Sequence, residues 1–260
     1  CMGLDESSES EGLDRSHICI PENQKQLLEA VAQDNENLVV VLSAGSVVET
    51  GWVSRCKAVL HAYLGGQAGA GAIMDVLTGR MNPSGKLAET LPLTYEDTPA
   101  ARYFPGKQQN VEYREGLYIG YRYYETAHVP VRYPFGYGLS YTSFTVTGTH
   151  TDPLGFRAEV TNTGKHPGKA VVMLFVEKPC GVLGNPTREL VAFGKTRLLS
   201  PGQSQSLSFS VTEYQLSSYD DSGITGHKSC YVLQQGAYRF YCGENVRDTP
   251  VSYTHLTLPT

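Results

Sequence analysis

Five carboxylates crowd the start of this chain, within the stretch Gly3–Arg15 (GLDESSESEGLDR). Acidic side chains this close repel one another. A carboxyl group held near other carboxylates, and partly desolvated by a bound substrate, therefore has a raised pKa. A general acid needs such a pKa to donate a proton near neutral pH. The stretch is a candidate for acid–base chemistry, and the alternative interpretation is a solvated acidic loop.

Three other patterns could indicate a nucleotide site, a catalytic serine or a metal site, but their spacing does not match the motifs of these sites. The glycines of Gly65–Gly71 miss both the dinucleotide spacing and the Lys-Ser/Thr of a phosphate-binding loop. Ser43–Ser46 (SAGS) lacks the Gly-x-Ser-x-Gly pattern of a hydrolase serine. The histidines are not paired at metal-ligand spacing. The sequence therefore implies neither a metal nor an organic cofactor.

Length and charge limit the remaining classes of function. At 260 residues the chain is long enough for two domains, and 40% apolar with 18% charged residues is typical of a globular protein. A net charge of −5 gives no basic surface for nucleic acid or for an anionic membrane. The longest apolar run, Leu38–Leu42, is too short to span a bilayer.

The cysteines are scattered through the chain without a Cys-x-x-Cys pair. We interpret them as buried free thiols, which favours a reducing, cytoplasmic compartment: Cys1, Cys19, Cys56, Cys180, Cys230 and Cys242. The chain opens on Cys-Met as if at the end of a strand, so we expect its first residue to lie inside a longer protein.

The first part of the chain alternates helix and strand patterns. Pro21 begins an amphipathic helix that reaches Gln33, and Leu38–Leu42 is an apolar run typical of a strand buried on both faces. A second buried strand is predicted at Ala58–Leu64, followed by a helix over Gln67–Leu77 with Ile73, Met74, Val76 and Leu77 inward. This order predicts an α/β fold, a mostly parallel sheet with flanking helices.

The second part changes to short alternating strands after a tyrosine-rich loop, residues 94–133. About seven strands indicate an all-β, immunoglobulin-like sandwich, with these clear segments: Phe144–Thr149, Phe156–Asn162, Ala170–Glu177, Glu189–Leu199, Ser204–Val211 and Cys230–Cys242. The last residues, 251–260, fit neither pattern, and we leave them out of the predicted fold as a non-native tail.

The motifs also resemble a known family. Besides Gly3–Arg15, the stretches concerned are Ile20-Pro21 with Gln24, Leu64–Gly69 (LGGQAG), Asn82–Leu87 (NPSGKL), Tyr113–Tyr123 (YREGLYIGYRY) and Tyr133–Tyr141 (YPFGYGLSY). In this order they resemble the C-terminal part of family 3 glycoside hydrolases, the β-glucosidase and β-xylosidase family. The resemblance implies a family 3 α/β domain over 1–140, a fibronectin type III-like sandwich over 141–250, and the tail 251–260.

The resemblance also implies a reaction. The complete protein would be a retaining enzyme that releases terminal, non-reducing β-D-glucosyl residues from an oligosaccharide or β-glucoside. Its acid/base would be Glu9 or Glu11, with Glu9 slightly preferred. From their charges, we expect Asp14 and Arg15 to form an ion pair that anchors the loop to the sheet, and contact with the substrate is the alternative. The nucleophilic aspartate would lie on a (β/α)8 barrel that this chain lacks.

Several alternatives stay open. Because the barrel selects the sugar, the enzyme could equally be a β-xylosidase or an N-acetylglucosaminidase of the same family. A different class, a non-catalytic carbohydrate-binding or scaffolding module, would need stacked aromatic side chains and not crowded acids. The sequence does not indicate an oligomeric state.

Overall fold

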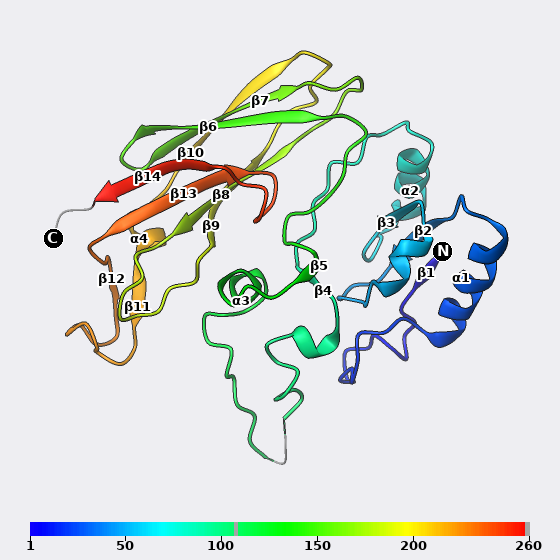
Figure 1. Cartoon of the computed structure of the whole chain (residues 1–260), viewed down its shortest axis with the longest axis horizontal. Helices are drawn as coiled ribbons and strands as arrows, with labels where there is room; N and C mark the ends of the chain where they lie inside the picture. Colours follow the sequence, from blue (N-terminus) through cyan, green and yellow to red (C-terminus); the bar gives the residue numbers. More distant parts are fainter. Residues whose placement is uncertain (107–108, 258–260) are drawn as a thin grey trace. The chain divides into compact units, whose positions relative to one another are not determined.

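The computed structural model describes residues 1–106 and 109–257, and of 251–257 the backbone alone. It divides into two compact units that interleave along the chain (Figure 1). Unit 1 contains Cys1–Met81, Glu89–Glu115 and Pro130–Tyr133. Unit 2 contains Asn82–Ala88, Gly116–Val129 and everything from Pro134 onward. The chain thus passes between the units several times before it enters the sandwich.

A parallel sheet is the centre of unit 1. Its strands are β1 (Met2–Gly3), β2 (Val39–Ser43) and β3 (Ala58–His61), in the order β1-β2-β3. The predicted strand over 38–42 forms as the central strand β2, in which Val40, Val41 and Leu42 are buried. A strand covered on both faces explains its continuous apolar run.

Unit 1 contains further elements outside this sheet. They are α1 (Glu22–Asp34), a 3₁₀ helix (Gly51–Arg55), α2 (Gly69–Leu77), β4 (Leu91–Pro92), a second 3₁₀ helix (Tyr95–Asp97) and β5 (Val131–Tyr133), which pairs with β4. The core of unit 1 is a single cluster built from Ile20, Leu28, Val40, Leu42, Ala44, Val48 and Trp52. It combines one side of α1 with β2 and the segment after it.

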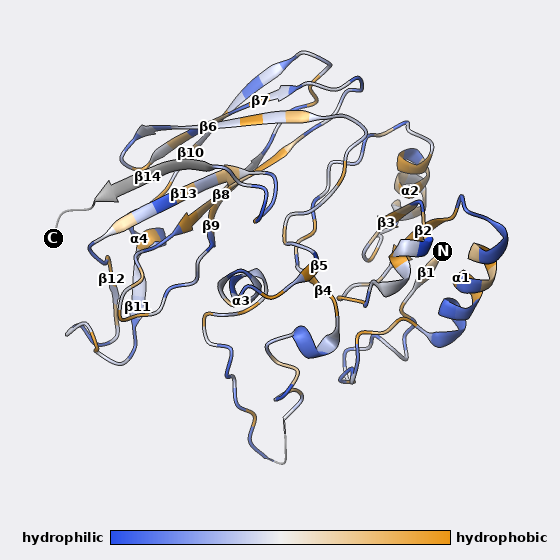
Figure 2. Ribbon diagram, in the orientation of Figure 1, coloured by the Kyte–Doolittle hydropathy of each residue, from blue (hydrophilic) through white to orange (hydrophobic). Residues whose placement is uncertain are grey.

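The predicted burial of α2 is wrong for two of its residues. Met74 and Leu77 were expected to face inward, but their side chains are 55% and 42% exposed. No residue of α2 is buried, although Figure 2 shows the helix as largely hydrophobic. The reason is that none of the described elements covers α2 enough to bury any of its side chains. An apolar surface is left open there.

Unit 2 is built around two antiparallel sheets. One has the order β10-β7-β6, from β6 (Phe144–Asp152), β7 (Gly155–Asn162) and β10 (Ser204–Ser210). The other has the order β14-β13-β8-β9, from β8 (Val171–Glu177), β9 (Glu189–Lys195), β13 (Ala237–Gly243) and β14 (Val251–Thr257). Side chains of β7, β8 and β13 meet in one core, which includes Val160, Leu174 and Phe240. Their alternation is the pattern seen in the sequence.

Three segments of the chain differ from their predictions. Cys230–Cys242 is not one strand but two, β12 (Cys230–Val232) and β13, because the chain turns at Gly236, whose φ is 147°. β12 pairs with β11 (Ser218–Asp220), whereas β13 pairs with β8. The predicted loop 94–133 contains α3 (Tyr121–Thr126) as well as β5, and its residues 107–108 lie outside the described part. The tail does not stay outside the sheet, since the backbone of β14 pairs with β13.

The cysteines are free thiols, as predicted, but the expected burial holds only for Cys242. Cys1, Cys180 and Cys230 are exposed because they lie at the chain end, in a loop and on the short ribbon β11-β12. Among the described residues, no helix has the length and apolar character needed to cross a membrane. A short helix, α4 (Glu213–Leu216), completes unit 2.

The core of unit 2 gives a direct test of the packing. Leu174 is 0% exposed, so Leu174→Ala should lower the free energy of unfolding by about 2–5 kcal/mol through lost burial and a residual cavity. Leu198→Ala, at a leucine that is 56% exposed, is the matched control and should change it far less. Urea denaturation measures both. Equal effects would contradict the packing of β8.

Candidate active site

The carboxyl ends of the three parallel strands bring distant residues to one edge of the unit 1 sheet. Leu4–Cys19 follows β1, Ala44–Ser46 follows β2, and Ala62–Leu64 follows β3. In parallel sheets, ligands bind beyond this edge because side chains from several connections converge there. The acidic loop predicted to do chemistry lies at this edge.

Asp5 shapes the acidic loop and is not free for chemistry. Its Oδ1 accepts hydrogen bonds from the Ser8 amide and the Ser7 hydroxyl, both at 2.8 Å, and its carbonyl accepts one from the Glu9 amide at 2.9 Å. The hydrogen bonds from Ser8 and Ser7 lower the pKa of Asp5. An ionised Asp5 therefore fixes a turn directly before Glu9.

Glu9 is the acid that the fold holds in place. Its Oε2 accepts a hydrogen bond from the Gly45 amide at 2.9 Å, and its Oε1 accepts one from the Ser46 hydroxyl at 2.6 Å. Desolvation raises the pKa of Glu9, but the hydrogen bonds from Ser46 and Gly45 and the charge of Arg15 outweigh it, so that the pKa is lowered. The raised pKa expected from crowded acids is therefore not found at Glu9 in the absence of substrate.

Arg15 acts through Ser46 and not through Asp14. Its Nη1 donates to the Ser46 hydroxyl at 2.8 Å and to the Val47 carbonyl at 3.1 Å. Asp14 is exposed, and the ion pairs of the described residues do not include one between it and Arg15. Arg15 thus orients the Ser46 hydroxyl, which in turn donates to Glu9.

Glu11, the other predicted candidate, has a different environment. Its side chain is exposed, and none of the hydrogen bonds or ion pairs found among the described residues involves it. The structure therefore separates the two candidates: Glu9 is fixed against the sheet edge, whereas Glu11 points into solvent. Ser46 and Gly45, which donate hydrogen bonds to Glu9, were missed by sequence reasoning, which had set the SAGS motif aside.

A further carboxyl lies at the same edge. Glu89, just before β4, is half-buried, and desolvation, with a smaller contribution from the charge of Glu9, raises its pKa. Sequence reasoning gave Glu89 no role. Glu9 and Glu89 thus differ in environment, since Glu9 accepts hydrogen bonds from backbone and hydroxyl donors whereas Glu89 is partly desolvated.

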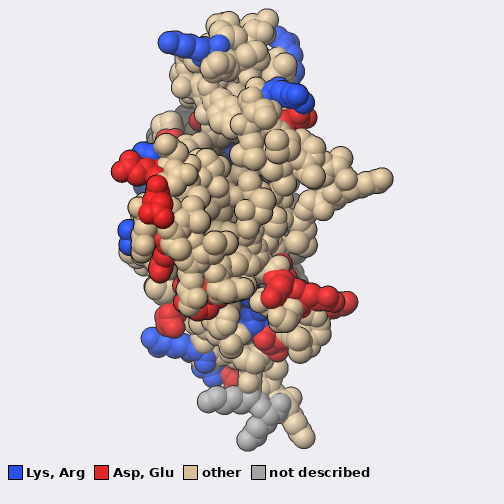
Figure 3. Space-filling model, turned by 90° about the vertical axis from the view of Figure 1, so that its right-hand side faces the viewer, with Lys and Arg blue, Asp and Glu red and all other residues tan. Residues whose placement is uncertain are grey.

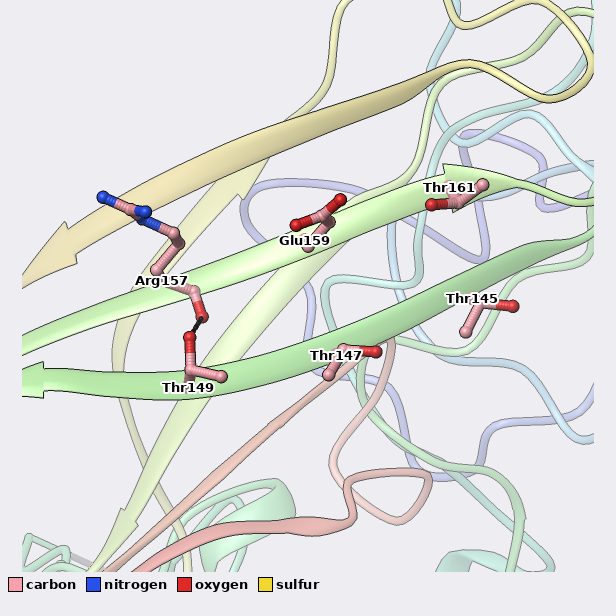
Figure 4. Close-up of a pocket in the computed structure, with 6 residues that line it drawn as sticks. All are labelled: Thr145, Thr147, Thr149, Arg157, Glu159 and Thr161. Atoms are coloured by element: carbon pink, nitrogen blue, oxygen red, sulfur yellow. Dashed lines mark hydrogen bonds between the residues drawn. The ribbon is translucent and has the colours of Figure 1, made fainter.

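Unit 2 has a shallow hollow that does not match this chemistry. It measures about 260 Å³ and lies over β6 and β7, where Thr145, Thr147 and Thr149 stand opposite Thr161, Glu159 and Arg157 (Figure 4). The Thr149 hydroxyl donates to the Arg157 carbonyl at 3.4 Å. A lining with one carboxylate lacks the paired acids of glycoside hydrolysis. The hollow is the polar outer side of a sandwich sheet.

The two hydrogen bonds that link Arg15 to Glu9 through the Ser46 hydroxyl can be tested by mutation in this chain. Ser46→Ala removes the donor to Glu9, so the pKa of Glu9 should rise toward its ordinary value of 4.5. Because the folded-state pKa is lowered, ionised Glu9 stabilises the fold above pH 4.5, and this contribution is lost as the pH falls. The variant should lose less stability than the parent on acidification.

Carbon-13 NMR titration of the Glu9 carboxyl measures this change. Ser16→Ala, at an exposed serine of the same loop, is the control and should leave the Glu9 titration unchanged. An unaltered Glu9 titration in Ser46→Ala would show that the Ser46 hydroxyl does not lower the pKa of Glu9, and would contradict this link.

Comparison with known proteins agrees with the two-part organisation. Residues 1–141 match the glycosyl hydrolase family 3 C-terminal domain, and residues 170–246 match a fibronectin type III-like domain. The chain is 42% identical over 254 residues to thermostable beta-glucosidase B of Acetivibrio thermocellus, covering 95% of this chain and 33% of that protein. It is 37% identical over 259 residues to an exo-alpha-(1->6)-L-arabinopyranosidase of Bifidobacterium breve, covering 97% and 33%.

Solved structures give the same result. A Bifidobacterium adolescentis GH3 beta-glucosidase superposes with a TM-score of 0.90 at 37% identity, covering 99% of this chain and 38% of that one. The beta-glucosidase of Kluyveromyces marxianus gives a TM-score of 0.92 at 30% identity, covering 99% and 31%. The chain spans about a third of the length of the relatives it matches. By its domain match and these relatives, the chain belongs to glycoside hydrolase family 3.

Proposed function

We propose that the protein is a retaining β-glycosidase of the β-glucosidase type, and that this chain supplies its acid/base. The single observation that carries the proposal is the Glu9 carboxyl, held by Gly45 and Ser46 at the carboxyl edge of a parallel sheet. A catalytic acid must be positioned to within a fraction of an ångström, and fixed backbone and side-chain donors provide such positioning. The relatives named as β-glucosidases support the type of reaction.

The proposed reaction has two steps. The acid/base first donates its proton to the glycosidic oxygen while a second carboxylate attacks the anomeric carbon. It then accepts a proton from the water that hydrolyses the glycosyl-enzyme, and so returns to its starting state. The second carboxylate, an aspartate in the family, would lie about 5–5.5 Å away on a barrel domain outside this chain. The chemistry requires no metal and no organic cofactor.

Glu9 is preferred over Glu11 because its position is fixed. Its lowered pKa belongs to the site without a sugar, where the carboxylate is still partly in water. A bound sugar and the neighbouring domain would remove that water and so raise the pKa toward the value a general acid needs. Glu11 remains the alternative, with Glu9 as the group that anchors the loop. Arg15 supports either arrangement through Ser46.

The sugar and the linkage are open within the family. One relative is named as an arabinopyranosidase, so similarity in this region does not restrict the sugar to glucose. A β-xylosidase or an N-acetylglucosaminidase would use the same acid. A non-catalytic carbohydrate-binding module is less well supported, because this edge holds the ordered carboxylate of Glu9 and not an aromatic surface.

We further propose that unit 1 is one part of a larger α/β domain that packs on the remainder of the protein. Its support is the exposed apolar surface formed by four side chains at and around α2: Leu64, Met74, Leu77 and Met81. Figure 3, which views the molecule from the right-hand side of Figure 1, shows broad uncharged areas between separated acidic and basic groups. Exposed apolar surface of this kind is typical of an interface.

Methionine oxidation tests whether the remainder of the protein covers the apolar surface around α2. Met74 and Met81 are 55% and 58% exposed in this chain, so peroxide should convert them readily to sulfoxides. In the full-length protein, their oxidation should slow several-fold, whereas Met173, 6% exposed in the sandwich, should react slowly in both. Mass spectrometry of peptides gives the rates. If Met74 and Met81 are oxidised at the same rate in this chain and in the full-length protein, the proposed packing on α2 is wrong.

The acid/base assignment is tested by kinetics on the full-length protein. Glu9→Gly should slow hydrolysis of a substrate with a poor leaving group by about 10²–10⁴-fold, because that bond needs the proton most. An activated aryl glycoside should be affected much less at the glycosylation step, and azide should restore turnover by replacing the base-activated water.

Glu11→Gly is the matched comparison and should retain the parent's dependence on the leaving group. The opposite result, with the dependence changed in Glu11→Gly alone, would transfer the role to Glu11. If neither variant changes it, the acid lies outside this loop. This chain by itself should be inactive, since it lacks the nucleophile.

A further inference from the structure

Three exposed tyrosines form a cluster on unit 2. Tyr214 lies on α4, Tyr219 on β11 and Tyr231 on β12, and Figure 1 shows these elements next to one another. The Tyr231 ring contacts both others, with its centroid 4.6 Å from that of Tyr214 and 5.1 Å from that of Tyr219. Although the rings touch, the three residues are 62%, 49% and 54% exposed in chain order. A contiguous aromatic surface of this kind is typical of a binding site.

The local fold directs this tyrosine cluster outward. Tyr219 and Tyr231 are paired across β11 and β12, so their side chains leave the ribbon on the same face. Ser218 and Asp220, the neighbours of Tyr219, point to the opposite face and are buried. On α4, Leu216 is buried in the core of the sandwich. Both elements therefore bury one side in unit 2 and leave their tyrosines exposed.

Polar contacts fix the backbone beneath the cluster. The Lys178 ammonium, itself buried, donates to the Ser217 carbonyl at 2.8 Å, at the point where α4 passes into β11. The Ser218 hydroxyl donates to Asn185 Oδ1 at 2.6 Å. Rings carried on a fixed backbone lose little conformational freedom when a ligand binds. The cluster is therefore already arranged for contact before a ligand arrives.

The turn that joins β11 to β12 is fixed in the same way. Asp220 Oδ1 accepts a hydrogen bond from the Gly223 amide at 2.7 Å, and its Oδ2 accepts from the Thr225 amide at 2.8 Å and the Thr225 hydroxyl at 2.6 Å. The Ser229 amide donates to the Asp220 carbonyl at 2.6 Å. The Asp220 carboxylate thus holds the turn, and the surface offered to a ligand consists of the tyrosine rings and hydroxyls.

The chemistry of the cluster fits an uncharged sugar. A β-glucosyl ring has an apolar face of C–H bonds and hydroxyls around its rim, and a tyrosine offers a flat apolar ring with a hydroxyl at its edge. The same segments carry the exposed Glu213, Asp221 and Lys228, whose charges are of both signs and favour neither an anion nor a cation strongly. Adjacent rings suit a chain of sugars, because each ring can contact a different sugar unit.

We propose that the tyrosine cluster is a binding site on unit 2 for a neutral chain of β-linked glucosyl residues. The choice of ligand rests on the proposed function, in which the protein acts on β-glucosides, whereas the cluster itself is a feature of unit 2. Its role is to retain an oligosaccharide on the protein by stacking and hydrogen bonding. It takes no part in proton transfer, which belongs to Glu9 in the proposed reaction.

Binding is measured in this chain by NMR titration of the tyrosine ring signals with cellotetraose, a neutral β-linked glucosyl chain. The signals of Tyr214, Tyr219 and Tyr231 should move together and give a dissociation constant in the millimolar range or below. Tyr231→Ala removes the central ring and should weaken binding about fivefold or more, the effect of losing one aromatic contact. Tyr231→Phe keeps the ring and should retain most of the affinity.

Further variants separate lost binding from other effects. Tyr214→Ala changes α4 and leaves the ribbon intact, and it should also weaken binding. Tyr113→Ala, at an exposed tyrosine outside the cluster, is the matched control and should leave binding unchanged. Glu9→Gln should leave it unchanged too, because Glu9 belongs to unit 1.

Two results would overturn the inference. One is that cellotetraose moves no ring signal of the cluster, or that Tyr231→Ala and Tyr214→Ala bind it as well as Tyr113→Ala does. The other is that the ring signals move with protein concentration, and that ultracentrifugation shows a dimer which Tyr231→Ala abolishes, since the cluster would then be an interface between two copies. Neither result bears on Glu9, whose role is decided by the leaving-group dependence. A failure of that kinetic test would in turn leave a measured binding site intact.

Discussion

The hydrogen bonds from Gly45 and Ser46 to the Glu9 carboxylate are the contacts on which the candidate site depends. They join the loop after β1 to the turn after β2, and this is possible because parallel strands end at one edge. A β-carbon on Gly45 would lie 2.8 Å from Leu64 Cδ1, so the exposed Leu64 side chain would have to shift. The buried strand β2 holds this turn in place. A local change in β2 would therefore displace the acid.

The pKa of each carboxyl at this edge depends on its own hydrogen-bond donors and burial, and not on the number of acids nearby. Asp5 is occupied by its own turn, Glu9 is held by donors that lower its pKa, and Glu89 has a pKa raised by burial. Neighbouring carboxyls in different environments can thus serve different roles.

Much of the fold could be predicted from periodicity, because strands such as β2 and β7 carry an apolar pattern that only one packing satisfies. Cys230–Cys242 was misread as one strand because both halves carry apolar residues, and only the short segment 233–236, which ends at Gly236 with its positive φ, separates them. The acidic loop was identified, but its electrostatics were not: the Ser46 donor lies 37 residues from Glu9. Such contacts, and the burial of Glu89, are products of tertiary structure that spacing does not encode. The burial of α2 was misjudged because its apolar pattern predicts burial, whereas none of its residues is buried.

The central claim is that Glu9 protonates the glycosidic oxygen, and a crystal structure of the full-length protein with a bound, non-hydrolysed β-glucoside tests it most directly. The account predicts a Glu9 carboxyl oxygen within about 2.6–3.2 Å of the glycosidic oxygen, with Gly45 and Ser46 still supporting the loop. A structure in which Glu11 occupies that position while Glu9 keeps its contacts to the sheet edge would contradict the claim.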